Sequence, residues 1–197
     1  LFKFLEDFHK ASESEYKSVI DHIKEQLGEE YQTEASAIGP WAWTDPFCQN
    51  DPLTTQDLDD FIEKVDLIES ASSFYQSMGF DVSDILKRSD LYEREQKNQH
   101  AFCINIDRED DIRILCNLRP NSYWLETLLH ELGHAIYEKG FKPELPWALK
   151  MPPHMITTEA IALITGRQAY DPDFLKKITK DEELSASLNK IISSQKR

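Results

Sequence analysis

The sequence predicts a mainly α-helical protein that carries one small β-hairpin. Apolar residues recur at the three- and four-residue spacing of helices over most of the chain. Only residues 101–117 alternate between apolar and polar side chains around a short polar stretch, as the strands of a hairpin do. The chain has 197 residues, enough to bury a sizeable core, and contains neither an internal repeat nor a linker. A single domain over residues 1–197 is therefore expected.

Several helices are expected from apolar periodicity. They cover residues 4–27, 54–78 and 81–91 before the hairpin, and residues 171–178 and 181–192 near the end of the chain. Gly28 is expected to end the first helix, because glycine is common just past a helix C-terminus. Thr54 or Thr55 is expected to cap the second. Residues 38–47 combine aromatic residues with glycine and proline, which indicates an irregular segment whose rings pack into a core.

The hairpin is expected to pair residues 101–107 with residues 112–117. A two-residue loop at positions 109–110 would place Cys103 directly opposite Cys116. Such a pair can form a disulfide in an oxidising compartment or remain as two free thiols in a reducing one. Both states stay open at the level of sequence.

A helix with a single apolar stripe is expected over residues 122–138. The residues of the stripe are Leu125, Leu128, Leu129, Leu132 and Ile136. Asn121 or Ser122 would cap the start of this helix, and Gly140 would end it. The stripe would anchor the helix in a core and leave the opposite face free to line a cleft.

That opposite face carries the sequence HELGH at residues 130–134. His130 and His134 are four residues apart, so they lie on one helix face and can both reach a single metal ion. Glu131 points close to the same ion and can take a proton from a water molecule that the metal activates. The pattern is typical of zinc-dependent amide hydrolysis.

A catalytic zinc ion usually has three protein ligands, so a third residue is needed. Glu159 is the preferred candidate, 25 residues after His134 and on a second helix that follows a proline-rich loop. Ala162 and Gly166 share its helix face, and small residues there would let the two helices approach closely. The rival ligand is His154, which lies in the loop.

HELGH followed by a glutamate about 25 residues later is the gluzincin pattern. More specifically, the chain resembles the angiotensin-converting enzyme family of peptidyl dipeptidases and its bacterial relatives, with the thimet-type oligopeptidases as near neighbours. The segments that carry the resemblance are residues 53–79, 101–117, 130–137, 144–149 and 159–163, and residues 1–28 and 39–47 fit more loosely.

The resemblance implies gluzincin catalytic helices within a larger, cleft-shaped helical peptidase that acts on short peptides. It implies one Zn²⁺ held by His130, His134 and Glu159, with Glu131 as the general base. It also implies that a strand at Ala101, Phe102 and Cys103 binds the substrate backbone beside the zinc ion.

Two departures from the family pattern favour an alternative, a non-catalytic or degenerate zinc-binding or interaction domain. The family has an aspartate four residues after the ligand glutamate that orients a zinc-binding histidine, whereas this chain has Leu163. The family's tyrosine and histidine that stabilise the tetrahedral intermediate lie well downstream of the ligand glutamate, whereas after Glu159 this chain has no histidine and only Tyr170 as a tyrosine. The chain is therefore expected to be a piece of a longer polypeptide.

The amino-acid composition limits the kinds of partner that the chain can bind. The formal net charge is −14, which argues against nucleic acid as a partner. No apolar run is long enough to span a bilayer. The sequence does not fix the compartment; the cytoplasm is favoured, where both thiols would remain free.

Overall fold

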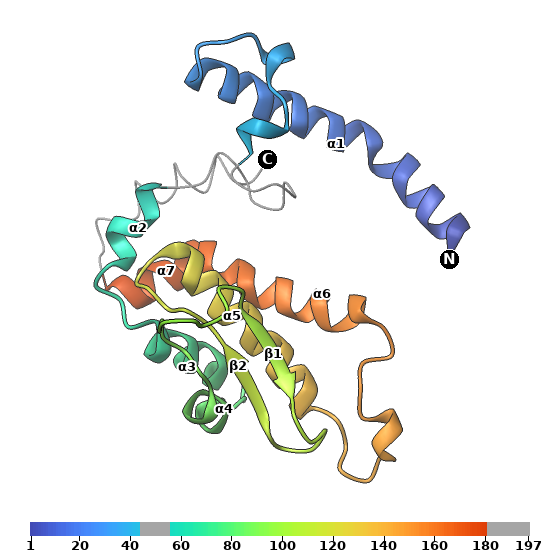
Figure 1. Ribbon diagram of the computed structural model, residues 1–197, viewed down its shortest axis with the longest axis vertical. Coiled ribbons are helices and arrows are strands. Elements are labelled where there is room, and N and C mark those ends of the chain that lie inside the picture. Colours follow the sequence, from blue (N-terminus) through green and yellow to red (C-terminus); the bar gives the residue numbers. More distant parts are fainter. Residues whose placement is uncertain (44–55, 181–197) are drawn as a thin grey trace. The chain divides into compact units, whose positions relative to one another are not determined.

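The computed structural model describes residues 1–43 and 56–180 (Figure 1). The chain divides into two compact units between residues 55 and 56. The first contains α1 (Phe2–Glu30), η1 (Ala35–Ala37) and η2 (Pro40–Ala42). The second contains α2 (Gln56–Ile62), α3 (Leu67–Ser77), α4 (Ser83–Arg88), β1 (Phe102–Asn105), β2 (Ile112–Leu115), α5 (Ser122–Lys139), η3 (Trp147–Leu149), α6 (Met155–Gly166), η4 (Arg167–Tyr170) and α7 (Pro172–Thr179). The mainly helical fold with one small hairpin is confirmed, whereas the single domain stays a prediction.

None of the described helices is long and apolar enough to cross a membrane. The predicted helix over residues 181–192 and the proposed caps Thr54 and Thr55 lie outside the described residues. The helix predicted over residues 171–178 is present as α7, where the side chain of Asp171 accepts hydrogen bonds from the amides of Asp173 and Phe174.

The first unit is a long helix with a short return. The prediction that Gly28 ends this helix is wrong, since α1 continues to Glu30. A Cβ atom at Gly28 would lie 2.9 Å from the carbonyl oxygen of Thr33, so the glycine makes room for the returning chain. Trp43 packs against the small core there, as expected, but Trp41 is 61% exposed.

The long helix predicted over residues 54–78 is in fact two helices. α2 ends at Ile62, and α3 begins at Leu67. The side chain of Asp66 accepts a hydrogen bond from the amide of Glu69 and caps α3. Apolar periodicity continues across the break, so it could not reveal a cap in the middle of the pattern.

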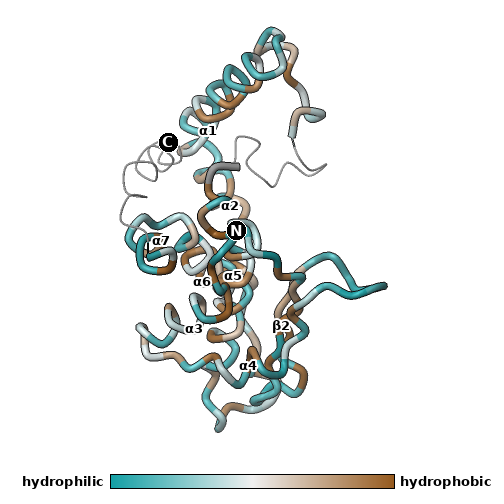
Figure 2. The backbone as a smooth tube through the Cα atoms, turned by 90° about the vertical axis from the view of Figure 1, so that its left-hand side faces the viewer, coloured by the Kyte–Doolittle hydropathy of each residue, from teal (hydrophilic) through white to brown (hydrophobic). Residues whose placement is uncertain are grey.

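The core of the second unit surrounds α5. The buried leucines of α5 meet side chains from the helices and the hairpin around it, among them Tyr75, Ile85, Ile112, Ile114 and Leu175. Figure 1 shows the hairpin lying over α5, with α6 beside that helix. Figure 2 shows hydrophobic stretches of α5, α6 and β2 in this region.

The hairpin has a different register from the predicted one. Cys103 pairs with Ile114, and Phe102 pairs with Leu115, so Cys103 is not opposite Cys116. The turn is longer than two residues, because the amide of Ile106 bonds to the carbonyl of Asp111. Asp107 holds this turn by accepting hydrogen bonds from the amides of Glu109 and Asp111. Both cysteines are free thiols.

Candidate metal centre

Helix α5 positions the HELGH residues as the sequence predicts. The side chain of Asn121 accepts a hydrogen bond from the amide of Trp124 and caps the helix, and Gly140 ends it. The predicted apolar stripe faces the core: its four leucines are fully buried, and Ile136 packs against them. His130 and His134 are therefore held one turn apart on a helix that the core fixes in place.

Helix α6 approaches α5 at Gly133. A Cβ atom there would lie 2.7 Å from the Cα of Ala162 and 2.4 Å from the Oγ1 of Thr165, so only glycine fits. One helical turn away, a Cβ atom at Gly166 would lie 3.3 Å from the Cβ of His130. The predicted role of Ala162 and Gly166 in close helix packing is confirmed.

The backbone just before the histidines is fixed from two sides. The carbonyl oxygen of Leu129 accepts hydrogen bonds from the hydroxyl of Tyr75 on α3, at 2.5 Å, and from that of Thr165 on α6, at 3.1 Å. Both donors come from other helices, so they hold this turn of α5 against α3 and α6 at once.

Three metal-binding side chains converge between the two helices. The Nε2 atoms of His130 and His134 are 3.2 Å apart. The carboxylate of Glu159 reaches both, with its Oε2 3.6 Å from His130 Nε2 and its Oε1 3.6 Å from His134 Nε2. Ligand atoms bound tetrahedrally to zinc at 2.0–2.1 Å lie about 3.3 Å from one another. The donor set and its spacing therefore fit a zinc ion.

The rival ligand His154 lies elsewhere in the structure. It precedes α6, and its Nδ1 accepts a hydrogen bond from the amide of Ile156, so it caps the helix. Within residues 1–43 and 56–180, the group of potential metal ligands comprises His130, His134 and Glu159 alone. The geometry thus favours Glu159 over His154 as the third ligand.

Burial keeps the two histidines in the form that binds metal. It lowers the pKa of both rings, and for His130 the neighbouring His134 lowers it further, while the charge of Glu159 opposes both shifts. A metal ion binds the neutral imidazole, so a lowered pKa favours binding down to a lower pH.

Glu131 is a buried carboxylate beside this cluster. The residue is only 7% exposed. Burial, followed by the charge of Glu159, raises the pKa of the Glu131 carboxyl to about 7. A carboxylate of raised pKa is a stronger base than an exposed one, which suits it to accept a proton from water.

His134 has a hydrogen-bonding partner that the sequence did not predict. The Nδ1 of His134 lies 2.7 Å from the Oγ1 of Thr158, a buried residue next to Glu159. Leu163, at the position of the family's aspartate, is 54% exposed. One signal was available: Thr158, Ala162 and Thr165 recur at helical spacing, so they share the face that packs on α5.

The predicted substrate strand lies beside α5. The pairing of Ile106 with Asp111 and the bond from the amide of Ile114 to Ser89 fix the alternation of the ladder. The backbone N–H and C=O groups of Ala101 and Cys103 consequently point away from β2, whereas those of Phe102 point toward it. Burial, and after it the charge of nearby Glu131, raises the pKa of the Cys103 thiol to about 12.

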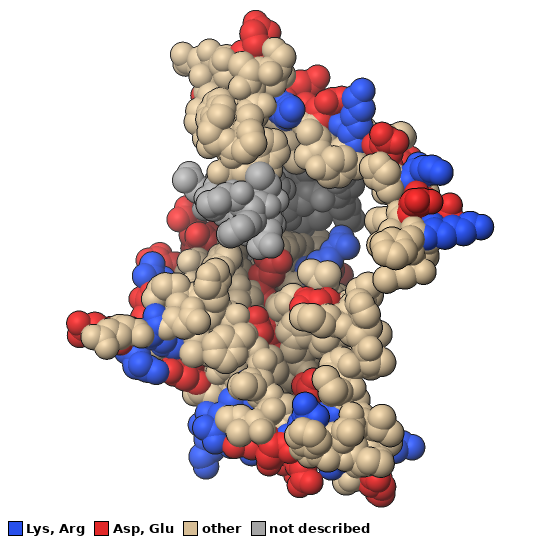
Figure 3. All heavy atoms as spheres, turned by 45° about the vertical axis from the view of Figure 1, so that its right-hand side comes forward, with Lys and Arg blue, Asp and Glu red and all other residues tan. Residues whose placement is uncertain are grey.

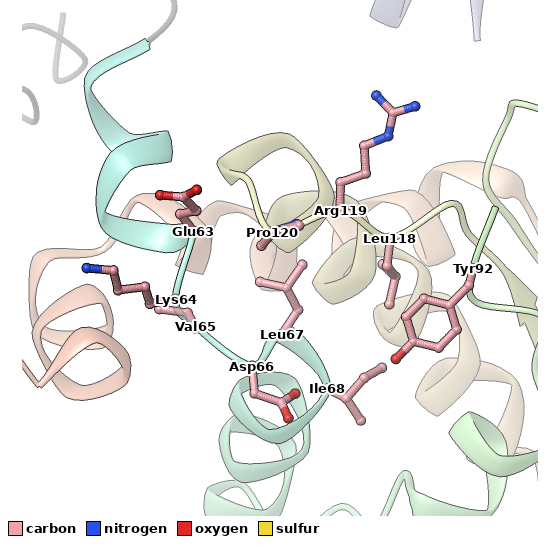
Figure 4. A pocket seen from close by; sticks show the side chains of 10 residues that line it. All are labelled: Glu63, Lys64, Val65, Asp66, Leu67, Ile68, Tyr92, Leu118, Arg119 and Pro120. Carbon is pink, nitrogen blue, oxygen red and sulfur yellow. The ribbon is translucent and has the colours of Figure 1, made fainter.

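A separate pocket of about 380 Å³ lies between the α2–α3 connection and the loop before α5 (Figure 4). In Figure 4 the side chains of Ile68 and Leu118 and the ring of Tyr92 lie on one side of it, with Glu63 and Lys64 on the other. Its lining includes none of the three potential metal ligands. It is not part of the metal centre.

Charged residues form no single-sign region over the part of the second unit that faces the viewer in Figure 3, where acidic and basic side chains are interspersed.

One comparison with known proteins gives a match. Residues 47–158 match the family model described as Carboxypeptidase Taq (M32) metallopeptidase. The matched range covers more than half of the chain, includes the whole HELGH motif and ends one residue before Glu159. It indicates a zinc metallopeptidase family, as the resemblance implied, but not specifically the angiotensin-converting enzyme or thimet-type family. No curated protein matches the chain.

Proposed function

Because the chain belongs to the carboxypeptidase Taq (M32) family of zinc metallopeptidases, we propose that it hydrolyses peptide bonds near the C-terminus of short peptides. The observation that carries the proposal is the convergence of His130, His134 and Glu159 from two closely packed helices. These three residues would hold the Zn²⁺ ion, and Glu131 would serve as the general base.

The residues around the cluster have distinct parts in this reaction. Zinc supplies Lewis acidity, which polarises a peptide carbonyl and makes water more acidic. Glu131 takes a proton from the attacking water and passes it to the leaving amine. Its burial beside the ligands keeps the carboxylate near the reacting atoms and away from bulk solvent.

The substrate would bind as an extended strand along β1. The free backbone groups of Ala101 and Cys103 would pair with the peptide backbone, and Phe102 would place its half-exposed ring beside it. Backbone pairing gives affinity with little dependence on side chains. The proximity of Cys103 to Glu131 supports this placement, since a peptide on that edge would pass close to the base.

The family match bears on where the peptide is cut. Its description names a carboxypeptidase, which favours release of single C-terminal residues over release of dipeptides or internal cleavage. Mass spectrometry of the products from blocked penta- and hexapeptides separates these three cases.

The test combines zinc content with peptide hydrolysis. We expect about one zinc ion per chain, and a Glu131→Gln variant that retains the zinc but loses on the order of 10²- to 10⁴-fold in hydrolysis rate. Glu144→Gln, which replaces an exposed glutamate beyond the end of the same helix, is the control and should keep the parental rate. A Glu131→Gln variant with parental activity would contradict the role of the base. A parent chain that binds zinc but cleaves no peptide would support the non-catalytic alternative.

A further inference from the structure

Thr158 contacts one of the two histidines at the nitrogen that does not face the metal centre. The Oγ1 of Thr158 lies 2.7 Å from His134 Nδ1, whereas His134 Nε2 faces Glu159 and His130. Thr158 is buried and lies in the first turns of α6, immediately before Glu159. Helix α6 therefore carries both Glu159, a potential metal ligand, and Thr158, the hydrogen-bonding partner of the potential ligand His134.

This contact selects the tautomer of the neutral His134 ring, that is, which of its two nitrogens carries the hydrogen. A neutral imidazole carries its hydrogen on one nitrogen only, and the other has the lone pair that a metal requires. If Nδ1 donates its hydrogen to the Thr158 hydroxyl, Nε2 presents its lone pair to the centre. The hydrogen bond also restricts rotation of the ring about its bond to Cβ.

We propose that Thr158 is the positioning residue that orients His134 for zinc, through a neutral hydroxyl instead of a carboxylate. Leu163 is apolar and 54% exposed, so it offers His134 no hydrogen bond. A neutral partner fixes the orientation of the ring without adding negative charge to the site. This inference rests on the proposed zinc site but not on peptide hydrolysis.

The expected effect is on zinc affinity. Thr158→Val keeps the shape of the side chain and removes the hydroxyl, so the ring loses its partner. Loss of such partners typically weakens metal binding on the order of 10- to 100-fold. Thr158→Ser retains a hydroxyl and should keep zinc affinity close to that of the parent.

A matched control is available one residue away. The hydroxyl of Thr157 bonds to the carbonyl of His154 and lies 3.2 Å from the Tyr137 hydroxyl, and it contacts no potential ligand. Thr157→Val should leave zinc affinity unchanged. The measurement is a zinc titration of the full chain against a chromophoric chelator, with the thermal unfolding of each metal-free variant compared in parallel.

The outcomes separate this inference from the proposed function. Parental zinc affinity in Thr158→Val, or an equal loss in Thr158→Ser, overturns the inference and leaves the function standing. A loss confined to Thr158→Val supports the inference even if no peptide is cleaved, in which case the function fails. A parent chain that binds no zinc overturns both.

A second measurement does not depend on how the variants fold. In the metal-free parent, ¹H–¹⁵N spectra of the histidine rings should show neutral His134 with its hydrogen on Nδ1, because no metal ion then dictates which nitrogen carries it. A hydrogen on Nε2 would overturn the assignment of Thr158.

Discussion

Glu131 illustrates at the scale of one residue how a buried carboxyl group can weaken the fold. Its carboxyl lies among buried groups, where burial and then the Glu131 charge raise the pKa of Cys103 and Cys116 to about 12. An ionised carboxylate in such surroundings costs free energy unless it is paired. In the metal-free protein, the charge of Glu159 adds to that cost.

A prediction about the metal-free protein follows from this pKa. Because the folded state raises the pKa of Glu131 from 4.5 to about 7, it binds the proton more tightly than the unfolded chain does. This contribution to stability is complete below pH 4.5 and is lost as the pH rises through about 7. Glu131→Gln should therefore stabilise the metal-free protein at pH 8 by roughly 2–3 kcal/mol.

Urea unfolding between pH 4.5 and 8, with a chelator present, measures this effect. Glu144→Gln replaces an exposed glutamate and should show the parental pH dependence. If Glu131→Gln followed the same pH dependence as the parent, the raised pKa would be refuted.

At the scale of elements, the α5–α6 pair determines whether the metal ligands meet. The two helices touch at Gly133, where backbone and side-chain atoms of α6 occupy the space of a Cβ atom. Glycine in a helix normally costs about 1 kcal/mol relative to alanine. Here that cost allows the close approach that brings Glu159 to the histidines.

Gly133→Ala is accordingly expected to destabilise the protein, although alanine is the better helix former. The added methyl group must push α6 away from α5, and such overpacking typically costs about 1–3 kcal/mol. Zinc affinity should fall as well, since Glu159 moves with α6. Chemical unfolding and zinc titration measure the two effects.

Ala160→Gly on the exposed face of α6 provides the comparison, because it reports helix propensity alone. A Gly133→Ala protein more stable than the parent would contradict the close packing.

At the scale of the whole molecule, zinc would join two consecutive α-helices through ligands that each helix supplies separately. A ligand that binds only the folded state stabilises it by about 2.7 kcal/mol when its concentration is 100 times Kd. Because His130 and His134 belong to α5 and Glu159 to α6, that energy opposes their separation.

Removal of zinc by a chelator should therefore lower the unfolding temperature, by about 5–10 °C for a chain of this size. Readdition of zinc should restore it, and magnesium should not, since it prefers oxygen ligands. Differential scanning calorimetry tests this expectation. A zinc-loaded protein that unfolds at the same temperature after chelation would show that the ion does not join the helices.

The sequence alone was sufficient to predict features that depend on residues close together in the chain. The spacing of His130 and His134 places both on one helix face, and the apolar stripe orients that face away from the core. Glu159 was preferred to His154 because two histidines and one glutamate are a known ligand set of catalytic zinc, and because the proline-rich loop leaves the position of His154 hard to fix. These inferences depend on helix periodicity and on the number of ligands that zinc takes, both of which hold before the chain folds.

The features that the sequence failed to predict depend on contacts between distant or competing groups. The break before Asp66 reflects a cap within a continuous apolar pattern, and the hairpin register depends on the bonds that Asp107 makes in the turn. Neither the cap at Asp66 nor the register of the hairpin changes the apolar periodicity from which the helices and strands were predicted.

The helical fold, the zinc-peptidase pattern and the three candidate ligands could all be predicted from the sequence. The contact of Thr158 with His134, and the close approach of α6 to α5 at Gly133, became apparent only from the tertiary structure. Periodicity fixes which side chains share a face of one helix, but not the rotation and distance between two helices. The rotation and distance between two helices are set by the packing of their side chains. At Gly133 the absence of a single Cβ atom allows α6 to approach α5.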